Sequence, residues 1–294
     1  MTNQSADEGF TVVIPCFNEE GAIAETLAHL ASTLPDAPEH EIIVVDDGST
    51  DGTPAILEDL ARQDKSFRVV VHQRNRGYGA ALKTGIRNAR FGLIVITDAD
   101  GTYPNDRIPD LLAACKDHDM AVGSRTGASV TYSKIRKIPK VFLTRWASWI
   151  ARQSIPDINS GLRVFKKSAA EKFLGILPDS FSFTMTITLA LLTNYRPVAF
   201  VPIDYHARVG QSKIKPIRDT LRFIMIILRT GVYFAPLRIF MPFVGILFAL
   251  AIGSLSYDAI VLENLTDKTV ILFLFAFNTG MFALLADMID KRSP

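Results

Sequence analysis

The sequence predicts an α/β domain with a mostly parallel sheet, followed by a C-terminal part that enters a membrane. Over roughly the first 125 residues, short Val/Ile-rich runs alternate with runs of helical spacing, which is typical of strands buried on both faces and joined by helices. Two later stretches carry no charge, Ile239–Tyr257 over 19 residues and Thr269–Ala286 over 18. Each is about long enough to cross a hydrocarbon core of ~30 Å. The mean hydropathy of +0.21 coexists with 21% charged residues because the apolar excess is confined to such stretches.

The strands are predicted from short apolar runs that end in proline, acids or glycine, and the helices from apolar residues three or four positions apart. In the first helix, for example, Ile23, Leu27, Leu30 and Leu34 share one side. The predicted strands are Phe10–Cys16, Glu41–Asp47, Phe67–His72, Leu93–Asp98, Met120–Gly123, Leu162–Phe165 and Val198–Tyr205. The predicted helices are Glu20–Leu34, Thr53–Asp64, Gly79–Arg90, Ile108–Lys116, Val141–Gln153 and Phe183–Thr193.

From Pro216 to Ala235 the pattern becomes that of an apolar helix with one basic stripe. Arg218, Arg222 and Arg229 fall within ~40° of one another at 100° per residue. Such a helix is typical of the membrane interface. We therefore divide the chain into a catalytic domain (1–212), a juxtamembrane basic helix (213–236) and a two-helix anchor (237–294) with spans at about 238–257 and 269–288.

Charge predicts the orientation of this anchor. The catalytic domain is nearly neutral, residues 213–257 carry a net charge of +5, and the loop 258–269 is acidic. By the positive-inside rule we expect both termini and the catalytic domain on the cytosolic side of the cytoplasmic membrane and the short loop outside. The alternative is that the two apolar stretches are core helices of a soluble protein. Nucleic-acid binding is disfavoured, because the sequence contains no strongly basic domain. The two cysteines, Cys16 and Cys115, do not make a disulfide framework.

Acidic residues at strand ends are the main chemical signal. Asp46 and Asp47 end one strand before the turn Gly48–Gly52, and Asp98 and Asp100 follow another. In an open parallel sheet, ligands bind beyond the carboxyl ends of the strands, so these acids should share one crevice. Grouped carboxylates suit a divalent cation that bridges phosphates. The alternative is that they are ordinary turn residues.

Two common nucleotide-binding motifs are excluded. Gly77-Tyr78-Gly79 opens a helix, but a dinucleotide fingerprint would need a glycine at position 82, which is Leu82. The sequence also has no Walker loop.

The order of the remaining motifs carries a resemblance. The chain contains in sequence VVIPCFNEEGAI, IIVVDDGSTDGT, NRGYGAALKTGI, DADGTYP and VGSR. In this it resembles a family 2 glycosyltransferase with a GT-A fold. Later it contains DINSGLRVF, SFTMTITLAL and RVGQSK before the membrane segments. These are similar to the polyprenyl-phosphate glycosyltransferases, the group of dolichol-phosphate mannose synthase and bactoprenol glucosyltransferase. The resemblance covers roughly residues 10–240.

The resemblance implies roles for particular residues on the donor side. Asp98 and Asp100 would hold Mg²⁺ or Mn²⁺, and together with Arg125, Arg208 and Lys213 they would be catalytic. The residues expected at the nucleotide site are Pro15, Asn18, Glu19, Asp46, Asp47, Lys83 and Asp98. Many relatives have a Leu-Gln pair after the second aspartate, where this chain has Gly101-Thr102, so we expect Tyr103 or water to complete the metal shell.

On the acceptor side the resemblance implies a basic cluster near the membrane. The residues expected there are Arg125, Arg136, Asp157, Ser160, Arg163, Arg208, Ser212 and Lys213. They come from the GSR element, the DxxSGxR element, the RxGxSK element and the insert between them.

The expected reaction is metal-dependent inverting transfer of a sugar from a nucleotide-sugar to a polyprenyl phosphate in the bilayer. A hydroxyl acceptor needs a general base. In the family such acceptors go with a Glu-Asp pair and a Gln-x-x-Arg-Trp motif. Here no Glu-Asp pair follows DAD at a suitable place, and position 142, where the glutamine would be, is Phe142. A lipid phosphate is already largely ionised at neutral pH. A UDP-sugar is favoured over GDP-mannose. The alternatives are a dolichol-phosphate mannose synthase-type activity, transfer to a hydroxyl of a glycan or lipid, and an inactive membrane scaffold. A homo-oligomer is left open.

Overall fold

The computed structural model describes residues 9–34, 39–64, 66–126, 144–205 and 216–292, without the side chains of 216–223 and 290–292. Within these residues the catalytic part is built on one seven-stranded sheet with the order β3-β2-β1-β4-β6-β5-β7. The strands are β1 (Phe10–Cys16), β2 (His40–Asp46), β3 (Phe67–Val71), β4 (Leu93–Ile96), β5 (Met120–Arg125), β6 (Arg163–Lys166) and β7 (Val198–Ile203).

The sheet is mostly parallel, with one reversed strand. β1 pairs in parallel with both β2 and β4, β2 with β3, and β5 with β7. β6 lies between β4 and β5 and is antiparallel to both. Its first residue, Arg163, therefore lies at the same sheet edge as the last residues of its neighbours. The single reversal brings the loop that precedes β6 to the carboxyl ends of the parallel strands.

Helices cover both faces of the sheet, because the strand residues alternate between two apolar clusters. Val12 and Ile14 pack with α1 (Ile23–Thr33), α2 (Thr53–Gln63) and α4 (Ile108–Cys115) on one face. On the opposite face, Val13 packs with α3, α6, α7, α8 and the helical residues 144–151. Their bounds are α3 (Tyr78–Asn88), α6 (Lys167–Glu171), α7 (Phe183–Thr193) and α8 (Pro216–Phe234).

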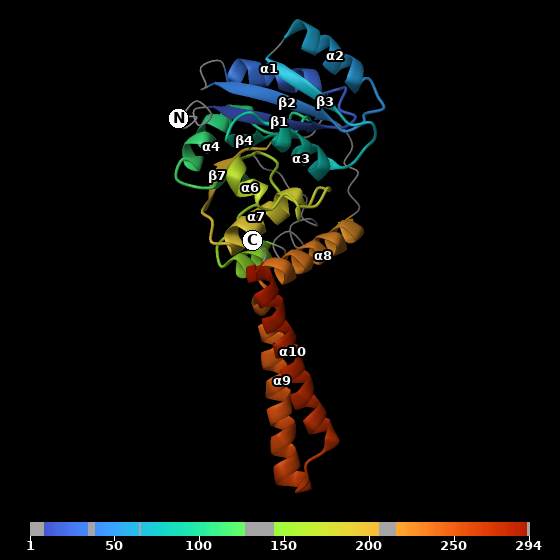
Figure 1. The fold of residues 1–294 in the computed structure, drawn as a ribbon, viewed down its shortest axis with the longest axis vertical. Coiled ribbons are helices and arrows are strands. Elements are labelled where there is room, and N and C mark those ends of the chain that lie inside the picture. The colour runs from blue at the N-terminus through green and yellow to red at the C-terminus, as the bar shows by residue number, and fades with distance from the viewer. Residues whose placement is uncertain (1–8, 35–38, 65, 127–143, 206–215, 293–294) are drawn as a thin grey trace.

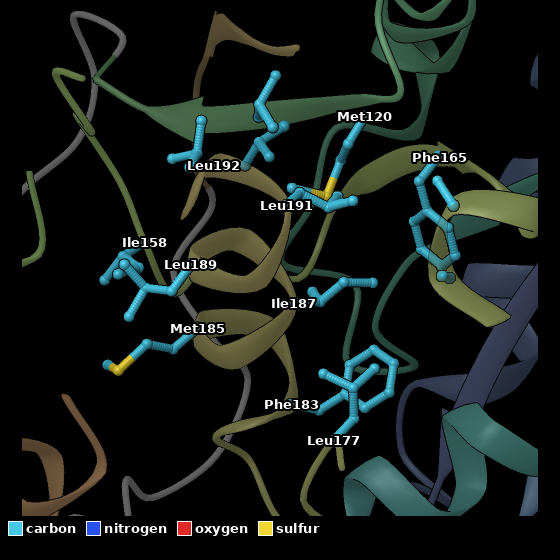
Figure 2. Close-up of a cluster of buried hydrophobic side chains, with 14 of the residues drawn as sticks. Met120, Ile158, Phe165, Leu177, Phe183, Met185, Ile187, Leu189, Leu191 and Leu192 are labelled. Atoms are coloured by element: carbon cyan, nitrogen blue, oxygen red, sulfur yellow. The ribbon is translucent and has the colours of Figure 1, made fainter. Parts of the chain in front are cut away.

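Helix α7 is the centre of the second cluster. Every residue from Phe183 to Leu192 is buried, so α7 has no solvent-facing side. A helix that is apolar all round belongs inside a protein. Figure 2 shows its side chains pointing in different directions, with Phe183 close to Leu177. The neighbouring side chains Met120, Ile158 and Phe165 come from β5, the loop before β6 and β6 itself.

The C-terminal part is a helical hairpin that projects from the catalytic part (Figure 1). α9 (Pro236–Tyr257) continues through a π-helical turn (Asp258–Leu262), and α10 (Asp267–Arg292) returns alongside it. Two candidate spans, Pro236–Leu262 and Asp267–Ile289, have mean hydropathies of 2.2 and 2.1, and only 17% of each apolar window is buried. Such exposed apolar helices differ from the buried core helices of a soluble protein.

Helix α8 runs crosswise over the root of this hairpin (Figure 1). Its buried residue Ile227 packs on the catalytic part, whereas Arg229 is exposed. The exposed position of Arg229 fits the basic stripe expected from the sequence.

The far end of the hairpin is closed by a buried polar cluster. Asp258 is 1% exposed, and its Oδ2 accepts hydrogen bonds from the Thr266 amide at 2.9 Å, the Thr266 hydroxyl at 2.6 Å and the Thr269 hydroxyl at 2.7 Å. Glu263 adopts the left-handed conformation with φ 50°. The turn is therefore fixed by side-chain acceptors where the helix ladder stops.

The predicted fold class is confirmed: a mixed α/β sheet is followed by two apolar C-terminal helices. The strand and helix boundaries agree with the sequence pattern within a few residues, and residues 144–151 are helical within the predicted 141–153. The reversed β6, the short helix α6 and the π-helical turn were not predicted. The division at residues 212 and 236 stays a prediction.

Candidate active site

The ends of five strands meet at one edge of the sheet. Because β1, β2, β4 and β5 point the same way, their carboxyl ends lie together, and the start of the reversed β6 joins them. The polar motifs of the sequence follow or precede these ends directly. The expected crevice at the carboxyl ends of a parallel sheet is therefore built from these loops.

The loops after β1 and β2 are fastened to each other. Asn18 adopts the left-handed conformation with φ 55°, and its Oδ1 accepts the Thr50 amide at 2.8 Å. The amides of Asn18 and Glu19 in turn donate to the hydroxyls of Ser49 and Thr53, both at 3.0 Å. Pro15, also expected at the nucleotide site, is buried in β1 opposite Val45. The two loops thus form one rigid wall of the site.

Asp46 and Asp47 are buried, at 1% and 3% exposure, and serve the loops around them. Asp46 accepts the Ser49 amide at 2.9 Å. Asp47 accepts the amides of Arg76 at 2.9 Å and Gly77 at 2.7 Å, and its Oδ1 lies 2.6 Å from His72 Nδ1. Asp47 therefore positions the segment that leads into α3.

Cys16 ends β1 beside these acids. Burial, with a smaller contribution from Asp46, raises the pKa of its thiol to about 12. The group is a protonated thiol at neutral pH and is not a nucleophile.

Asp98 is held from two sides. The Tyr78 hydroxyl, at the start of α3, donates to Asp98 Oδ1 at 2.9 Å. Burial and the nearby Asp98 raise the pKa of Tyr78 well above its ordinary value, so the phenol remains a donor. On the other side, a Cβ on Gly161 would lie only 2.7 Å from Asp98 Oδ2. Tyr78 and Gly161 therefore fix this carboxylate at the sheet edge.

The second acid of the DAD sequence is held by its own turn. Asp100 Oδ1 accepts the Thr102 hydroxyl at 2.6 Å and the Thr102 amide at 3.2 Å. Tyr103, expected as a substitute for a missing metal ligand, is 4% exposed and accepts the Gly161 amide through its hydroxyl at 2.6 Å. The hydroxyl of Tyr103 thus supports the loop before β6.

Arg125 and Asp157 form a bidentate ion pair. Arg125 Nε and Nη2 lie 2.7 and 3.0 Å from the two oxygens of Asp157, which is 1% exposed. The guanidinium also lies over the Tyr205 ring, 5.1 Å from its centroid, and Tyr205 packs edge-on against Tyr103. This arrangement joins the end of β5, the loop before β6 and the end of β7.

Arg163 is fully buried, although an arginine of this motif was expected to contact the acceptor. Its guanidinium donates to the carbonyls of Ser160 and Thr184 and to the Thr188 hydroxyl. Burial lowers its pKa to about 10, so it remains charged at neutral pH. In this conformation Arg163 holds β6 against α7. The hydroxyl of Ser160 itself is buried and has no hydrogen-bond partner among the described residues.

Lys83 lies on α3 and pairs with Asp179 at 2.9 Å. The carbonyl of Asp179 accepts the amides of Gly79 and Ala80, so the loop before α7 covers the start of α3. Phe181 in this loop is 74% exposed and stacks on Tyr78 at 5.2 Å between centroids.

The described residues among those expected therefore gather around one edge, but several are engaged in supporting contacts. Four expected residues, Arg136, Arg208, Ser212 and Lys213, lie outside the described residues. The sequence did not predict the contacts by which Tyr78, Tyr103 and Tyr205 support the site. For Tyr78 the sequence did offer a signal, an aromatic residue between two glycines at the start of a helix.

The carboxylates of Asp98 and Asp100 are the type of ligand that a divalent cation such as Mg²⁺ prefers. Within the described residues no group of three or more His, Cys, Asp or Glu side chains forms a complete metal cage. Asp98 and Asp100 nevertheless supply hard oxygen donors on one loop. Two carboxylates suffice for Mg²⁺ when phosphate oxygens and water supply the other ligands.

With this geometry in place, comparison with known proteins gives the class. Residues 11–174 match the model of glycosyl transferase family 2, and residues 235–291 match that of the GtrB C-terminal hairpin. The chain belongs to glycosyl transferase family 2 and carries the hairpin that this second model describes. The family predicted from the sequence motifs is confirmed.

Named relatives extend over most of the chain. Polyprenol monophosphomannose synthase of Mycolicibacterium smegmatis is 32% identical over 69% of this chain and 80% of its own length. Dolichyl-phosphate hexose transferase of Haloferax volcanii is 28% identical over 74% of this chain and 90% of its own length. The chain spans only 52% of another relative from that organism, the low-salt glycan biosynthesis hexosyltransferase Agl6, at 28% identity.

Solved structures support the fold. Glucosyl-3-phosphoglycerate synthase from Mycobacterium tuberculosis, in complex with Mn²⁺, UDP and phosphoglyceric acid, superimposes with a TM-score of 0.57 at 19% identity, over 77% of this chain and 80% of that one. S. aureus TarS 1-349 in complex with UDP gives 0.53 at 22% identity, over 76% and 65%. The GT-A fold expected from the resemblance is confirmed. The hairpin match and the apolar helices together indicate membrane association.

Proposed function

We propose that this protein transfers a sugar from a nucleotide-sugar to a polyprenyl phosphate, with inversion at the anomeric carbon. The observation that carries the proposal is the combination, in one chain, of a family 2 transferase domain and an exposed apolar hairpin at its base. Relatives named as dolichyl-phosphate, undecaprenyl-phosphate and polyprenol transferases support a lipid phosphate as the acceptor.

The donor would lie along the wall made by the loops after β1 and β2. The loops are ordered by hydrogen bonds to Asn18 and Asp46. A ribose and base would meet the hydroxyls of these loops, and the diphosphate would extend towards Asp98 and Asp100, which follow the neighbouring strand β4. We favour a UDP-sugar and keep GDP-mannose as the alternative. A divalent cation held by Asp98 and Asp100 would neutralise charge on the leaving nucleoside diphosphate.

The acceptor side needs positive charge rather than a base. A phosphate monoester has a second pKa of ~6 and is already a competent nucleophile at neutral pH. Of the two expected cations of this side that the structure describes, Arg163 is buried and Arg125 is partly exposed, and Asp157 and Tyr205 fix the orientation of Arg125. A guanidinium that is held in place binds a phosphate with little further loss of side-chain freedom. The phosphate oxygen would then attack the anomeric carbon from the face opposite the leaving diphosphate.

The hairpin would bring the site to its substrate. We infer that α9 and α10 span the cytoplasmic membrane, with the catalytic domain and both termini cytosolic and the 258–266 turn outside. The exposed Arg229 on α8 would face anionic headgroups.

An acceptor and donor panel tests this proposal. Purified full-length protein in lipid nanodiscs receives labelled UDP- and GDP-sugars with polyprenyl phosphate, free polyprenol or a soluble glycan. Label should enter the lipid fraction only with polyprenyl phosphate and one class of nucleotide. Transfer to polyprenol or glycan in the absence of polyprenyl phosphate would contradict it, as would the absence of lipid product with every donor.

A further inference from the structure

An open pocket lies at the root of the membrane hairpin, and its lining differs from the described residues of the candidate active site. It has a volume of about 560 Å³ and is lined by Trp149, Arg152, Leu237, Arg238, Met241 and Pro242. None of these six residues belongs to the candidate active site. The pocket is therefore considered separately from that site.

Its lining is amphiphilic. Arg152 and Arg238 supply two guanidinium groups, and none of the lining residues that the structure describes is acidic. No ion pair between described residues includes either arginine. The remaining lining is apolar or aromatic. This combination suits a molecule with an anionic head and an apolar tail.

The pocket is also built on well-packed elements. Arg238 Nη1 donates to the Ile150 carbonyl at the end of the helical residues 144–151, and so ties the hairpin to the catalytic part. A Cβ on Gly231 of α8 would lie 3.0 Å from Ile150 and 3.1 Å from Ile239, so three elements meet closely here. Arg152 follows the helix in the left-handed conformation, with φ 53°. Arg238 is thus held by a backbone carbonyl, and Arg152 is exposed at the end of the neighbouring helix.

Its position matches the headgroup layer. Arg238 and Met241 lie in the first two turns of the span that begins at Pro236. Met241 is 50% exposed and Trp149 48%, and the apolar surface continues along α9 through Phe243. Tryptophan is enriched at membrane interfaces, where one end of the ring is apolar and the other wet. A lipid whose phosphate met the arginines would lay its chains along this surface.

We propose that this pocket binds the phosphate headgroup of an anionic phospholipid of the bilayer, between Arg152 and Arg238, with its chains against Trp149 and Met241. The inference rests on the membrane insertion of the hairpin proposed above. The bound lipid would fix the height and tilt of the catalytic domain relative to the bilayer.

Native mass spectrometry of the full-length protein in detergent tests this without using transferase activity. Phosphatidylglycerol and phosphatidylcholine are titrated separately. We expect one phosphatidylglycerol to bind each chain at least tenfold more tightly than phosphatidylcholine. Arg152→Gln should weaken phosphatidylglycerol binding about tenfold, as expected for loss of one charge-assisted contact, and Arg152→Lys should recover part of it. Arg152 is the better target because Arg238 also holds the Ile150 carbonyl.

Arg145→Gln is the matched control, because Arg145 is exposed on the same helix and does not line the pocket. It should leave phosphatidylglycerol binding unchanged. If Arg145→Gln weakened phosphatidylglycerol binding as much as Arg152→Gln, the lipid would be attracted to basic surface in general, and the proposal would be overturned. Equal binding of phosphatidylglycerol and phosphatidylcholine would also overturn it. Competitive displacement of phosphatidylglycerol by polyprenyl phosphate would assign the pocket to the acceptor and would also overturn it. A protein without transferase activity that still binds phosphatidylglycerol in this way would support the pocket and contradict only the proposed function.

Discussion

At the scale of single residues, the candidate site contains groups that hold its acids in place. Asp98 has a hydroxyl donor in Tyr78 and the bare backbone of Gly161 beside it. Asp47 and Arg163 are buried and bind main-chain groups of the surrounding loops. Much of the polar character of this sheet edge therefore serves to order loops.

Tyr78→Phe tests the hold on Asp98. Loss of a buried hydrogen bond to a charged group is worth ~1.5–3 kcal/mol, so kcat should fall by about 10- to 100-fold while the nucleotide still binds. Steady-state kinetics with the lipid acceptor would measure this. Tyr195→Phe is the control, because Tyr195 is 83% exposed, and it should behave as wild type. An unchanged kcat in Tyr78→Phe would remove Tyr78 from the account.

The position of the acids at strand ends was predicted correctly, because it depends on local sequence pattern, whereas their role in catalysis stays a prediction. The sequence did not predict the contact of Tyr78 with Asp98, because that contact joins α3 to the loop after β4 through the tertiary fold. The burial of Arg163 was not predicted either, because an arginine in a polar motif suggests a residue that binds a ligand. Only the reversed strand β6 and the buried helix α7 turn it inward.

At the scale of elements, the start of α3 is clamped by the loop before α7. The Asp179 carbonyl caps two amides of α3, and Lys83 reaches the Asp179 side chain. Gly79 allows the close approach, since a Cβ there would lie 2.1 Å from the Pro178 carbonyl oxygen. The glycines of this motif therefore serve packing against a loop about 100 positions later.

Gly79→Ala should accordingly destabilise the domain. The clash is with backbone atoms, which cannot rotate away, and overpacking of this kind costs about 1–3 kcal/mol. We expect Tm to fall by about 3–10 °C in thermal unfolding. Gly175→Ala is the matched control, because nothing lies within 4 Å of a Cβ there. A Tm for Gly79→Ala within 1 °C of the control would contradict the clamp.

Element identity was predictable from periodicity, and strand direction was not. A short run such as that of β6, whose sequence is RVFK, has the same pattern in a parallel and in an antiparallel strand. Its direction is known only from its pairing with β4 and β5. The π-helical turn after α9 likewise follows from the tertiary contacts of Asp258 with Thr266 and Thr269.

At the scale of the whole molecule, a transferase domain sits on a long apolar hairpin, with α8 across the junction (Figure 1). Charge patterning predicts the side of the membrane on which each part lies. The native cysteines are buried, and burial raises the pKa of Cys16 to about 12 and of Cys115 to about 11. Both thiols are protonated and shielded at neutral pH, which gives a low background for labelling.

Glu263→Cys and Tyr195→Cys test the topology in intact cells with a membrane-impermeant maleimide. Both positions are exposed, Glu263 at the hairpin turn and Tyr195 in the catalytic domain. We expect Glu263→Cys to be labelled at once and Tyr195→Cys only after permeabilisation. The reverse order would place the catalytic domain outside the cytosol and contradict the inferred orientation.

The most direct test of the central claim is the mass of the lipid product made by wild type and by Asp100→Ala in nanodiscs. The wild-type protein, supplied with a divalent cation, nucleotide-sugar and polyprenyl phosphate, should yield the lipid phosphate plus one sugar residue. Asp100→Ala, with an unchanged thermal unfolding curve, should lower that product at least 100-fold, as should removal of the cation by a chelator. Undiminished product from a folded Asp100→Ala protein, or a sugar attached without polyprenyl phosphate, would contradict the account.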